Sequence, residues 1–465
     1  MSDDGQHTIA ALSTPPGESG IAVVRMSGPG ALEILGAVLR TTRGGPFDSQ
    51  WEHRRLYRGI VVDRVEDPVD DVMCAVMLAP DTYTGEDTVE ISCHGSAIVV
   101  ATLLDLIYHH GARAAGPGEF TRRAFINGKM DLIQAEAVAD LIHSRSDLQR
   151  RVAQEQLAGG LSGRVELLAD QILELLGIIE ANIDFIEEDI NTLDREGAVA
   201  LLDEQCDELD DLLSSAHLSE AFREGYRVAI AGAVNAGKSS LFNQLVGERR
   251  AIVTEIPGTT RDVLREPVIL EGLVFTFQDT AGLRGRTDDV VESIGIDMAN
   301  EAVRSADLVL LVVDTSQPTD PSTEKTFRQL DRENALIVLN KIDLPATDAT
   351  ATLQESYPEA GFVPVSALNG EGVPELRRAI VAAVAGDELS RVARERVVLN
   401  RRLVGLLRQA KERAGDLRTA IESHNQLELL ALDARAVLGL YEEATGRRYQ
   451  PDLLDVIFSR FCIGK

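Results

Sequence analysis

The stretch GAVNAGKSS, residues Gly232–Ser240, places the strongest constraint on how this chain folds. It follows the apolar run YRVAIA and precedes SLFNQLVG, so it satisfies the pattern G-x-x-x-x-G-K-[ST] in a strand–loop–helix context. In such a loop the backbone N–H groups turn toward phosphate oxygens at the start of a helix. We expect Lys238 to reach the β- and γ-phosphates and the Ser239 hydroxyl to bind Mg²⁺. The sequence therefore predicts an α/β domain that binds a nucleotide.

Two further motifs identify the base as guanine. NKID (Asn340–Asp343) ends the apolar run ALIVL, and SAL (Ser366–Leu368) follows later in the chain. A carboxylate at Asp343 can accept both the N1–H and the amino group of guanine, whereas adenine offers no such pair of donors. The stem of Lys341 can lie over the base, and SAL closes the same side. Motifs in this order, each at the end of a strand-like run, predict specificity for GTP.

The γ-phosphate side is predicted from DTAG (Asp279–Gly282) and TEIPGTTRD (Thr254–Asp262). We expect the DTAG aspartate to hold Mg²⁺ through water and its glycine N–H to sense the γ-phosphate, with Thr259 or Thr260 above both as a switch. Leu283 stands where small signalling GTPases place a glutamine, so hydrolysis is either slow or assisted by another group. The candidate nucleotide site that these motifs make up contains Asn235, Ala236, Gly237, Lys238, Ser239, Ser240, Thr254, Glu255, Ile256, Pro257, Gly258, Thr259, Thr260, Asp279, Thr280, Ala281, Gly282, Asn340, Lys341, Asp343, Ser366, Ala367 and Leu368.

Bulk composition limits the class of protein. A chain of 465 residues predicts about three domains. The net charge of −29 excludes a uniformly basic nucleic-acid binder. The polar start MSDDGQHT and strand-length apolar runs argue against a secretory signal and a membrane span. Four scattered cysteines without CxxC pairing argue against a zinc site or a disulfide framework, so we predict a cytoplasmic protein without membrane association.

Four segments differ in their patterning. Residues 1–126 alternate short strand-like runs with turns and read as a compact α+β domain. Residues 127–222 and 387–465 carry apolar residues at three- and four-residue spacing, which predicts long amphipathic helices. Between them, residues 223–386 alternate strands and helices as in a parallel α/β sheet. The simplest architecture inserts this α/β domain into one helical domain whose two halves pair in space.

Several longer motifs together resemble one family, the tRNA-modifying GTPases called MnmE or TrmE. In chain order they are PPGESGIAVVRMSG, YTGED, FTRRAFINGKMDLIQAEAVADLI, the P-loop asparagine Asn235, TEIPGTTRD, DTAGLR and the terminal FCIGK. The resemblance runs from residue 8 to the last residue, and TRRAFINGK and FCIGK are far more specific than a P-loop. One departure is Glu18-Ser19, where many members have a small or basic pair.

The resemblance implies a multidomain α/β fold: an α+β domain similar to tetrahydrofolate-binding modules, an all-α domain and an inserted Ras-like P-loop domain. Members of the family are homodimers whose GTP hydrolysis depends on potassium. They act as a heterotetramer with the flavoprotein MnmG. Together the two proteins add a carboxymethylaminomethyl or aminomethyl group to C5 of the wobble uridine (U34) of certain tRNAs, with 5-formyl- or methylene-tetrahydrofolate as the one-carbon donor. The acidic composition suggests that the partner supplies much of the charge that binds tRNA.

The same resemblance assigns ion ligands and catalytic residues. Asn235 matches the asparagine that coordinates K⁺, and Thr260 matches the switch threonine on Mg²⁺. Glu292 matches a glutamate that orients the attacking water, the function that Leu283 lacks; the alternative is a solvated carboxylate. The residues implied for the metal sites are Ser239, Thr260, Asn235, Thr254, Ile256 and Thr259, and those implied for catalysis are Glu292, Cys462 and Lys238.

The implied folate site uses Arg25, Glu86, Lys129 and the terminal Lys465. Arginine and lysine suit the folate carboxylates, and a glutamate suits the donors on the pterin edge. SRFCIGK would then return to the N-terminal domain, where Cys462 matches the family's essential cysteine, a candidate nucleophile or acid/base. The alternative for this cysteine is a buried structural thiol.

Two other functions remain open. One is a regulatory or ribosome-assembly GTPase without modification chemistry, which predicts no role for Cys462 and no folate binding. The other is a folate-dependent one-carbon enzyme that GTP only regulates, which predicts folate turnover without tRNA or a flavoprotein.

Overall fold

The computed structural model describes residues 7–47, 50–184, 193–214, 216, 219–247, 267–279, 303–318, 334–347, 354–355, 361–386 and 388–465. Contacts divide the chain into two compact units. The first contains Met1–Ala139, Leu157–Thr192 and Gln426–Lys465, and the second contains Asp140–Gln156 and Leu193–Asn425. Within the described ranges, no helix has both the length and the apolar character needed to cross a bilayer.

The first unit begins with a seven-stranded sheet in the order β3-β4-β5-β6-β2-β1-β7. Side chains alternate along its strands, so that Val24 and Met26 enter the core under the first two helices, while Arg25 and Ser27 occupy the opposite face. The third helix and the C-terminal residues lie on that opposite face. The elements are β1 (Ile9–Leu12), β2 (Ser19–Ser27), α1 (Ala31–Val38), β3 (Leu39–Arg40), β4 (Arg55–Val62), β5 (Pro68–Met77), β6 (Thr88–Gly95), α2 (Ala97–His109), β7 (Arg113–Ala114) and α3 (Glu119–Ile126).

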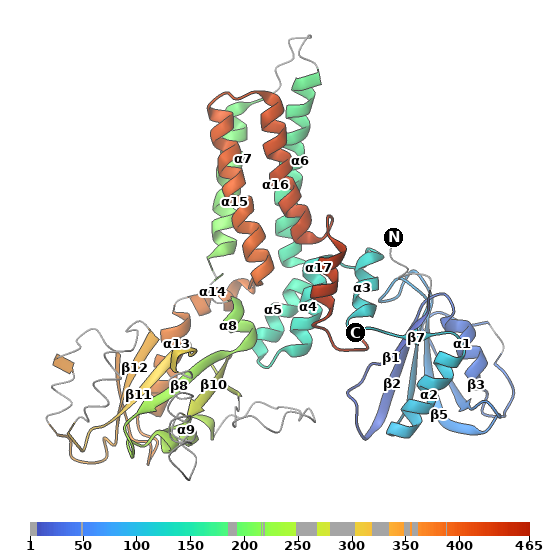
Figure 1. Ribbon diagram of the computed structural model, residues 1–465, viewed down its shortest axis with the longest axis horizontal. Helices are drawn as coiled ribbons and strands as arrows, with labels where there is room; N and C mark the ends of the chain where they lie inside the picture. The colour runs from blue at the N-terminus through green and yellow to red at the C-terminus, as the bar shows by residue number, and fades with distance from the viewer. Residues whose placement is uncertain are drawn as a thin grey trace, which may run out of the picture. The chain divides into compact units, whose positions relative to one another are not determined.

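Long helices pair across large separations in sequence. In the first unit α16 runs beside α6, with Arg435 and Glu180 joined at 2.6 Å (Figure 1). In the second unit α15 packs on α7, and Arg418 reaches Asp203 at 2.6 Å. Each pair joins a helix that precedes the α/β sheet to one that follows it, as the amphipathic patterns predict. The helices are α4 (Leu132–His143), α5 (Asp147–Leu157), α6 (Gly160–Asp184), α7 (Arg195–Leu213), α8 (Ser219–Glu224), α14 (Glu388–Glu395), α15 (Arg401–Glu422), α16 (Leu427–Thr445) and α17 (Pro451–Phe458).

The second unit contains a six-stranded sheet in the order β13-β12-β11-β8-β10-β9, parallel except for β9. The strand LVLLVVD, β11, is buried at almost every position, as is typical of a parallel strand that is covered on both faces. The carboxyl ends of β8 and β12 therefore open at the same edge, where the predicted motifs lie. The elements are β8 (Tyr226–Gly232), α9 (Lys238–Val246), β9 (Pro267–Leu270), β10 (Leu273–Asp279), β11 (Leu308–Asp314), β12 (Ala335–Asn340), β13 (Gly361–Val365) and α13 (Val373–Ala385).

The end of α16 yields a prediction about stability. Gly446 caps this helix with φ at +82°, and a Cβ built there would lie 2.7 Å from Phe125 Cε2 and 2.8 Å from Leu132 Cβ. We expect Gly446→Ala to destabilise the protein by about 1–3 kcal/mol, since it adds backbone strain and overpacking. The midpoint of thermal unfolding measures the effect.

The matched control is Gly163→Ala in α6, an exposed position where a Cβ would meet nothing within 4 Å. We expect this change to leave the midpoint unaltered or to raise stability by up to about 1 kcal/mol. Equal midpoints for the two variants would show that Gly446 is not constrained as described.

Candidate functional site

The loop between β8 and α9 has the backbone of a phosphate-binding loop. Asn235 and Gly237 have φ at +64° and +97°. A Cβ on Gly232 would lie 2.3 Å from Val312 O, so the loop leaves the strand only at a glycine. The buried Lys238 ammonium donates to the carbonyls of Gly232 at 2.9 Å and of Ala233 at 2.6 Å. The ammonium therefore sits at the mouth of the loop, at the N-terminus of α9, where both the charge and the helix dipole favour a phosphate.

Asn340, at the end of β12, connects this loop to the other predicted motifs. Its Nδ2 donates to Ala236 O at 2.8 Å, and its Oδ1 accepts from the Ala367 N–H at 3.0 Å. The side chain is 1% exposed, and a Cβ on Gly237 would lie 2.2 Å from its Nδ2. One buried amide thus holds the P-loop and the Ser366–Leu368 loop together.

Asp343 lies at the same edge, exposed and fixed on one side. Its Oδ1 accepts from the buried Ser366 Oγ at 2.6 Å. This bond orients the carboxylate and leaves it capacity for further donors, as recognition of guanine requires. Leu368, the last residue of the predicted loop, is 81% exposed.

Lys341, between Asn340 and Asp343 in the motif, adopts φ of +67° and its Nζ lies 2.6 Å from Asp314 Oδ2. Burial opposes the charged form of Asp314, but the bonds from Lys341 and Ser316 together hold the pKa of that carboxyl below its ordinary value. This ion pair fixes the end of the lysine stem beside β11.

Much of the predicted γ-phosphate side lies outside the described residues. The backbone of Asp279 ends β10 beside Ile230 of β8, but its side chain is outside the description. Ser239 and Ser240, which are predicted to bind the nucleotide, are exposed at the first turn of α9. The predicted residues outside the described ranges are Thr254, Glu255, Ile256, Pro257, Gly258, Thr259, Thr260, Thr280, Ala281, Gly282 and Glu292.

A second polar region lies in the first unit, where the chain ends. Ile463 forms a β-bridge with Pro117, and the Phe120 N–H donates to Lys465 O at 3.2 Å. The C-terminal segment that follows α17 therefore returns to the N-terminal domain, as expected from the sequence.

Gly464 makes the closest approach of this segment. Its φ is +96°, and a Cβ would lie 2.2 Å from Leu12 O. Its carbonyl accepts from Ser13 Oγ at 3.0 Å and from Arg25 Nη1 at 3.5 Å. Arg25 is also joined to Glu90 at 2.7 Å. The structure thus places Arg25 and the C-terminal residues together.

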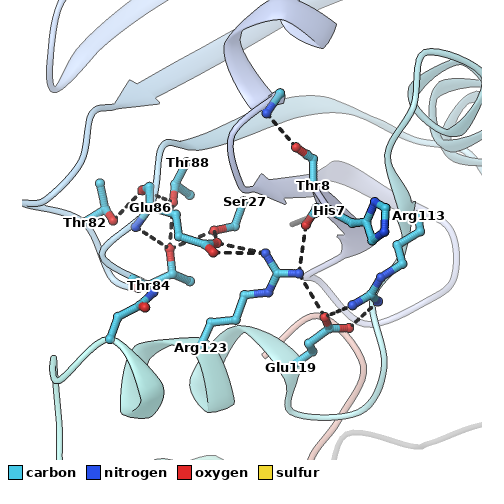
Figure 2. A network of polar contacts seen from close by, with 12 residues as sticks. His7, Thr8, Ser27, Thr82, Thr84, Glu86, Thr88, Arg113, Glu119 and Arg123 are labelled. Carbon is cyan, nitrogen blue, oxygen red and sulfur yellow. Dashed lines mark hydrogen bonds and ion pairs between the residues drawn. The ribbon is translucent and has the colours of Figure 1, made fainter. Parts of the chain in front are cut away.

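Glu86 is already engaged by protein groups, as Figure 2 shows. Both of its oxygens accept from Arg123 Nη1, at 3.1 and 3.0 Å, and one accepts from Ser27 Oγ at 2.7 Å. Arg123 is 2% exposed and also reaches Glu119, which pairs with Arg113 at 2.5 Å. The pterin-binding carboxylate expected at this position would therefore share its oxygens with a buried arginine.

Sequence analysis missed Arg123, Glu119 and Glu90 as site residues. The Glu119–Arg123 spacing of four residues on a helix was an available signal for an ion pair. Burial would raise the pKa of Glu119, but the bonds from Arg113 and the Gly116 N–H outweigh it and hold the pKa below its ordinary value. The carboxylate therefore remains charged at neutral pH within a nearly buried network.

Two of the predicted folate residues, Lys129 and Arg25, border the loop that contains the third, Glu86. A Cβ on Gly85 would lie 3.2 Å from Lys129 Cε, and the Arg25 guanidinium lies 6.0 Å from the Tyr83 ring centre. Lys465, the fourth, reaches α3 through its carbonyl. This combination of two cations, a carboxylate and an aromatic ring suits a flat, anionic ligand such as a folate.

Cys462 is exposed, in contrast to two other cysteines of the first unit. Burial raises the pKa of the Cys74 thiol to about 12 and also raises that of Cys93. The alternative of a buried structural thiol therefore does not hold for Cys462. Its carbonyl accepts from the Gly118 N–H at 3.4 Å, which anchors its backbone beside the start of α3.

Known proteins match this chain over nearly its whole length. A family model described as "MnmE helical domain" matches residues 132–462, and one described as "GTP-binding protein TrmE N-terminus" matches residues 8–129. The chain is 40% identical to the tRNA modification GTPase MnmE of Lactiplantibacillus plantarum, over 98% of each chain. It is 43% identical to that of Symbiobacterium thermophilum, over 99% of this chain and 100% of the relative. The chain therefore belongs to the MnmE (TrmE) family of tRNA modification GTPases.

Proposed function

We propose that this protein is a potassium-stimulated GTPase that acts in the modification of tRNA. The single observation that carries the GTPase assignment is the pair of hydrogen bonds made by Asn340, which assembles the P-loop and the base-side loop at one edge of a parallel sheet. Ligands bind at this edge in open α/β sheets. The names of the relatives support tRNA as the substrate.

The residues of the nucleotide site would have separate roles in binding and hydrolysis. Lys238 binds the β- and γ-phosphates, Asp343 selects guanine, and Glu292 orients the attacking water. Ser239 and Thr260 would hold Mg²⁺. Asn235, with the carbonyls of Thr254, Ile256 and Thr259, would hold K⁺. When bound, the two cations supply positive charge against the charge that develops on the phosphates.

The wobble-uridine chemistry is assigned to the first unit and a flavoprotein partner of the MnmG type. The polar face that contains Arg25, Glu86, Lys129 and Lys465 supports a tetrahydrofolate site. The exposed thiol of Cys462, anchored beside α3, supports its assignment as the reactive group. We propose a homodimer formed through the N-terminal domain, residues 1–126, and a cytoplasmic location.

The guanine assignment predicts a change of base specificity in Asp343→Asn. We expect the affinity for GTP to fall at least about 100-fold, because hydrogen bonds to a charged acceptor contribute about 1.5–3 kcal/mol each. Affinity for XTP should rise, since the new amide can donate to the carbonyl that replaces the amino group of guanine. Calorimetric titration with both nucleotides measures this.

Glu375→Gln is the matched control, because it removes an exposed carboxylate from α13 in the same domain. It should bind GTP as the wild type does. An Asp343→Asn variant with wild-type affinity for GTP would refute the base assignment.

The ion assignment predicts at least about tenfold faster GTP hydrolysis in KCl than in NaCl at equal ionic strength, because a cation of the right size acts at the phosphates as an arginine finger does. Asn235→Ala should lose the stimulation. Asn235→Gly should lose it equally while it relieves the left-handed backbone at φ +64°.

Asn243→Ala, on the exposed side of α9, is the control and should keep the stimulation. Equal wild-type rates in the two salts would remove K⁺ from the mechanism. The protein would then be a slow switch that requires an external activator.

A further inference from the structure

Helix α5 makes its contacts with a different unit from the segments that precede and follow it in the sequence. Residues Asp140–Gln156 belong to the second unit, whereas the segments on both sides of them belong to the first. Ser146 and Gln149 form a capping box at the start of α5: Gln149 N–H donates to Ser146 Oγ at 3.2 Å, and Gln149 Oε1 accepts from the Ser146 N–H at 3.3 Å. The acceptor of the Gln149 amide is thus used locally, which leaves its NH₂ group for other contacts.

Two buried glutamines of α5 donate to backbone carbonyls far away in sequence. Gln149 Nε2 donates to Phe222 O at 2.5 Å and to Arg223 O at 3.5 Å. Gln156 Nε2 donates to Val398 O at 2.6 Å. The glutamines are 7% and 3% exposed, and seven residues make about two helical turns, so both lie on one side of α5.

The three carbonyls belong to the two connectors of the α/β sheet. Phe222 and Arg223 lie in the last turn of α8, just before the sheet's first strand, β8. Val398 lies between α14 and α15, just after its last helices. Both the entry to and the exit from the inserted domain are therefore held by a single helix. We call Gln149 and Gln156, with these carbonyls, the α5 clamp.

Packing around the α5 clamp fixes it to the sheet. Val152, between the two glutamines, is 4% exposed and belongs to the hydrophobic core that includes Val228 and Phe275. Leu148 Cβ would lie 3.1 Å from a Cβ on Gly272, at the β9–β10 turn. A cavity of about 40 Å³ beside the glutamines has room for water but not for a nucleotide or a folate.

Ordinary packing does not call for this arrangement. An amide buried without a partner costs free energy, so an apolar side chain would serve simple packing at less risk. Here the Gln149 amide reaches carbonyls of the last turn of α8, which have no partner within their helix, and the Gln156 amide reaches Val398 O between α14 and α15. The salt bridge of Arg223 with Asp140 at 2.5 Å ties the entry connector to the end of α4 as well.

We propose that the α5 clamp couples the nucleotide state of the P-loop domain to the helices of the first unit, with Gln149 and Gln156 as positioning residues. This inference rests on the proposed GTPase function. Only Ala158 and Gly159 separate the end of α5 from the start of α6, so the chain itself provides the path for this coupling.

The test is Gln156→Met in the full-length protein, which keeps the side-chain length and removes the donor. Hydrogen exchange of residues 132–184 is compared between GTP- and GDP-loaded protein. We expect the hydrogen exchange of the wild type to differ between the two nucleotide states. In the variant this difference should be at least fivefold smaller, while its affinity for GTP stays within twofold of wild type. Gln154→Met, which changes an exposed glutamine of the same helix, is the control and should behave as wild type.

A difference retained in Gln156→Met, or absent from the wild type, would overturn the proposal. If Gln156→Met does not fold, Gln156→Glu replaces it, because the shape is nearly the same and only the protonated carboxyl can donate to Val398 O. The nucleotide-dependent exchange difference of Gln156→Glu, relative to that of the wild type at the same pH, should then recover as the pH falls. A difference equal to that of the wild type at every pH would overturn the proposal.

A parallel assay counts modified wobble uridines per GTP hydrolysed in the presence of the flavoprotein and tRNA. A wild type that shows the exchange difference but forms no modified uridine would refute the proposed tRNA function while leaving the α5 clamp in place. Both the tRNA function and the α5 clamp would be supported by two results together. The wild type would show the exchange difference and form modified uridine, and the variant would hydrolyse GTP but yield at least tenfold fewer modified uridines.

Discussion

The nucleotide site depends on the two hydrogen bonds of the buried Asn340 amide. P-loop and base-side loop are more than a hundred residues apart, and each is irregular backbone that could adopt other shapes. Because Asn340 ends a central parallel strand, its position is set by the sheet, and its amide transmits that position to Ala236 and Ala367. Removing this side chain would leave two loops without a common reference and a buried donor and acceptor without partners.

Sequence reasoning succeeded for the features that depend on short contiguous motifs. GAVNAGKSS, NKID and SAL each follow a strand, and the carboxyl ends of parallel strands meet at one edge, so their convergence followed from pattern alone. It failed where contacts join distant positions. Neither periodicity nor composition indicates that Arg123 pairs with Glu86, or that α5 belongs by its contacts with β8. Amphipathic spacing shows that a helix face is buried, but not which element covers it.

Gly464 determines where the C-terminal segment lies on the N-terminal domain. Only a residue without a Cβ fits at Gly464 against Leu12 O, and this contact brings the end of the chain onto the face that carries Arg25. Cys462 is left exposed two residues earlier. The predicted nucleotide edge belongs to the second unit. The chain passes between the two units within α4, at the end of α5, before α7 and between α15 and α16. In the proposed function, GTP hydrolysis belongs to the second unit and the uridine chemistry to the first, so the two must communicate through the chain.

The central claim is that these two chemistries reside in one chain and can be separated. It is tested most directly in Cys462→Ser, with Cys206→Ser as the control, by measuring GTP turnover and modified wobble uridine in the same reaction with the flavoprotein. The account predicts wild-type GTP turnover and loss of the modified uridine in Cys462→Ser only. Unchanged modification would contradict it and would favour a regulatory GTPase, and folate turnover without tRNA would favour a one-carbon enzyme that GTP regulates.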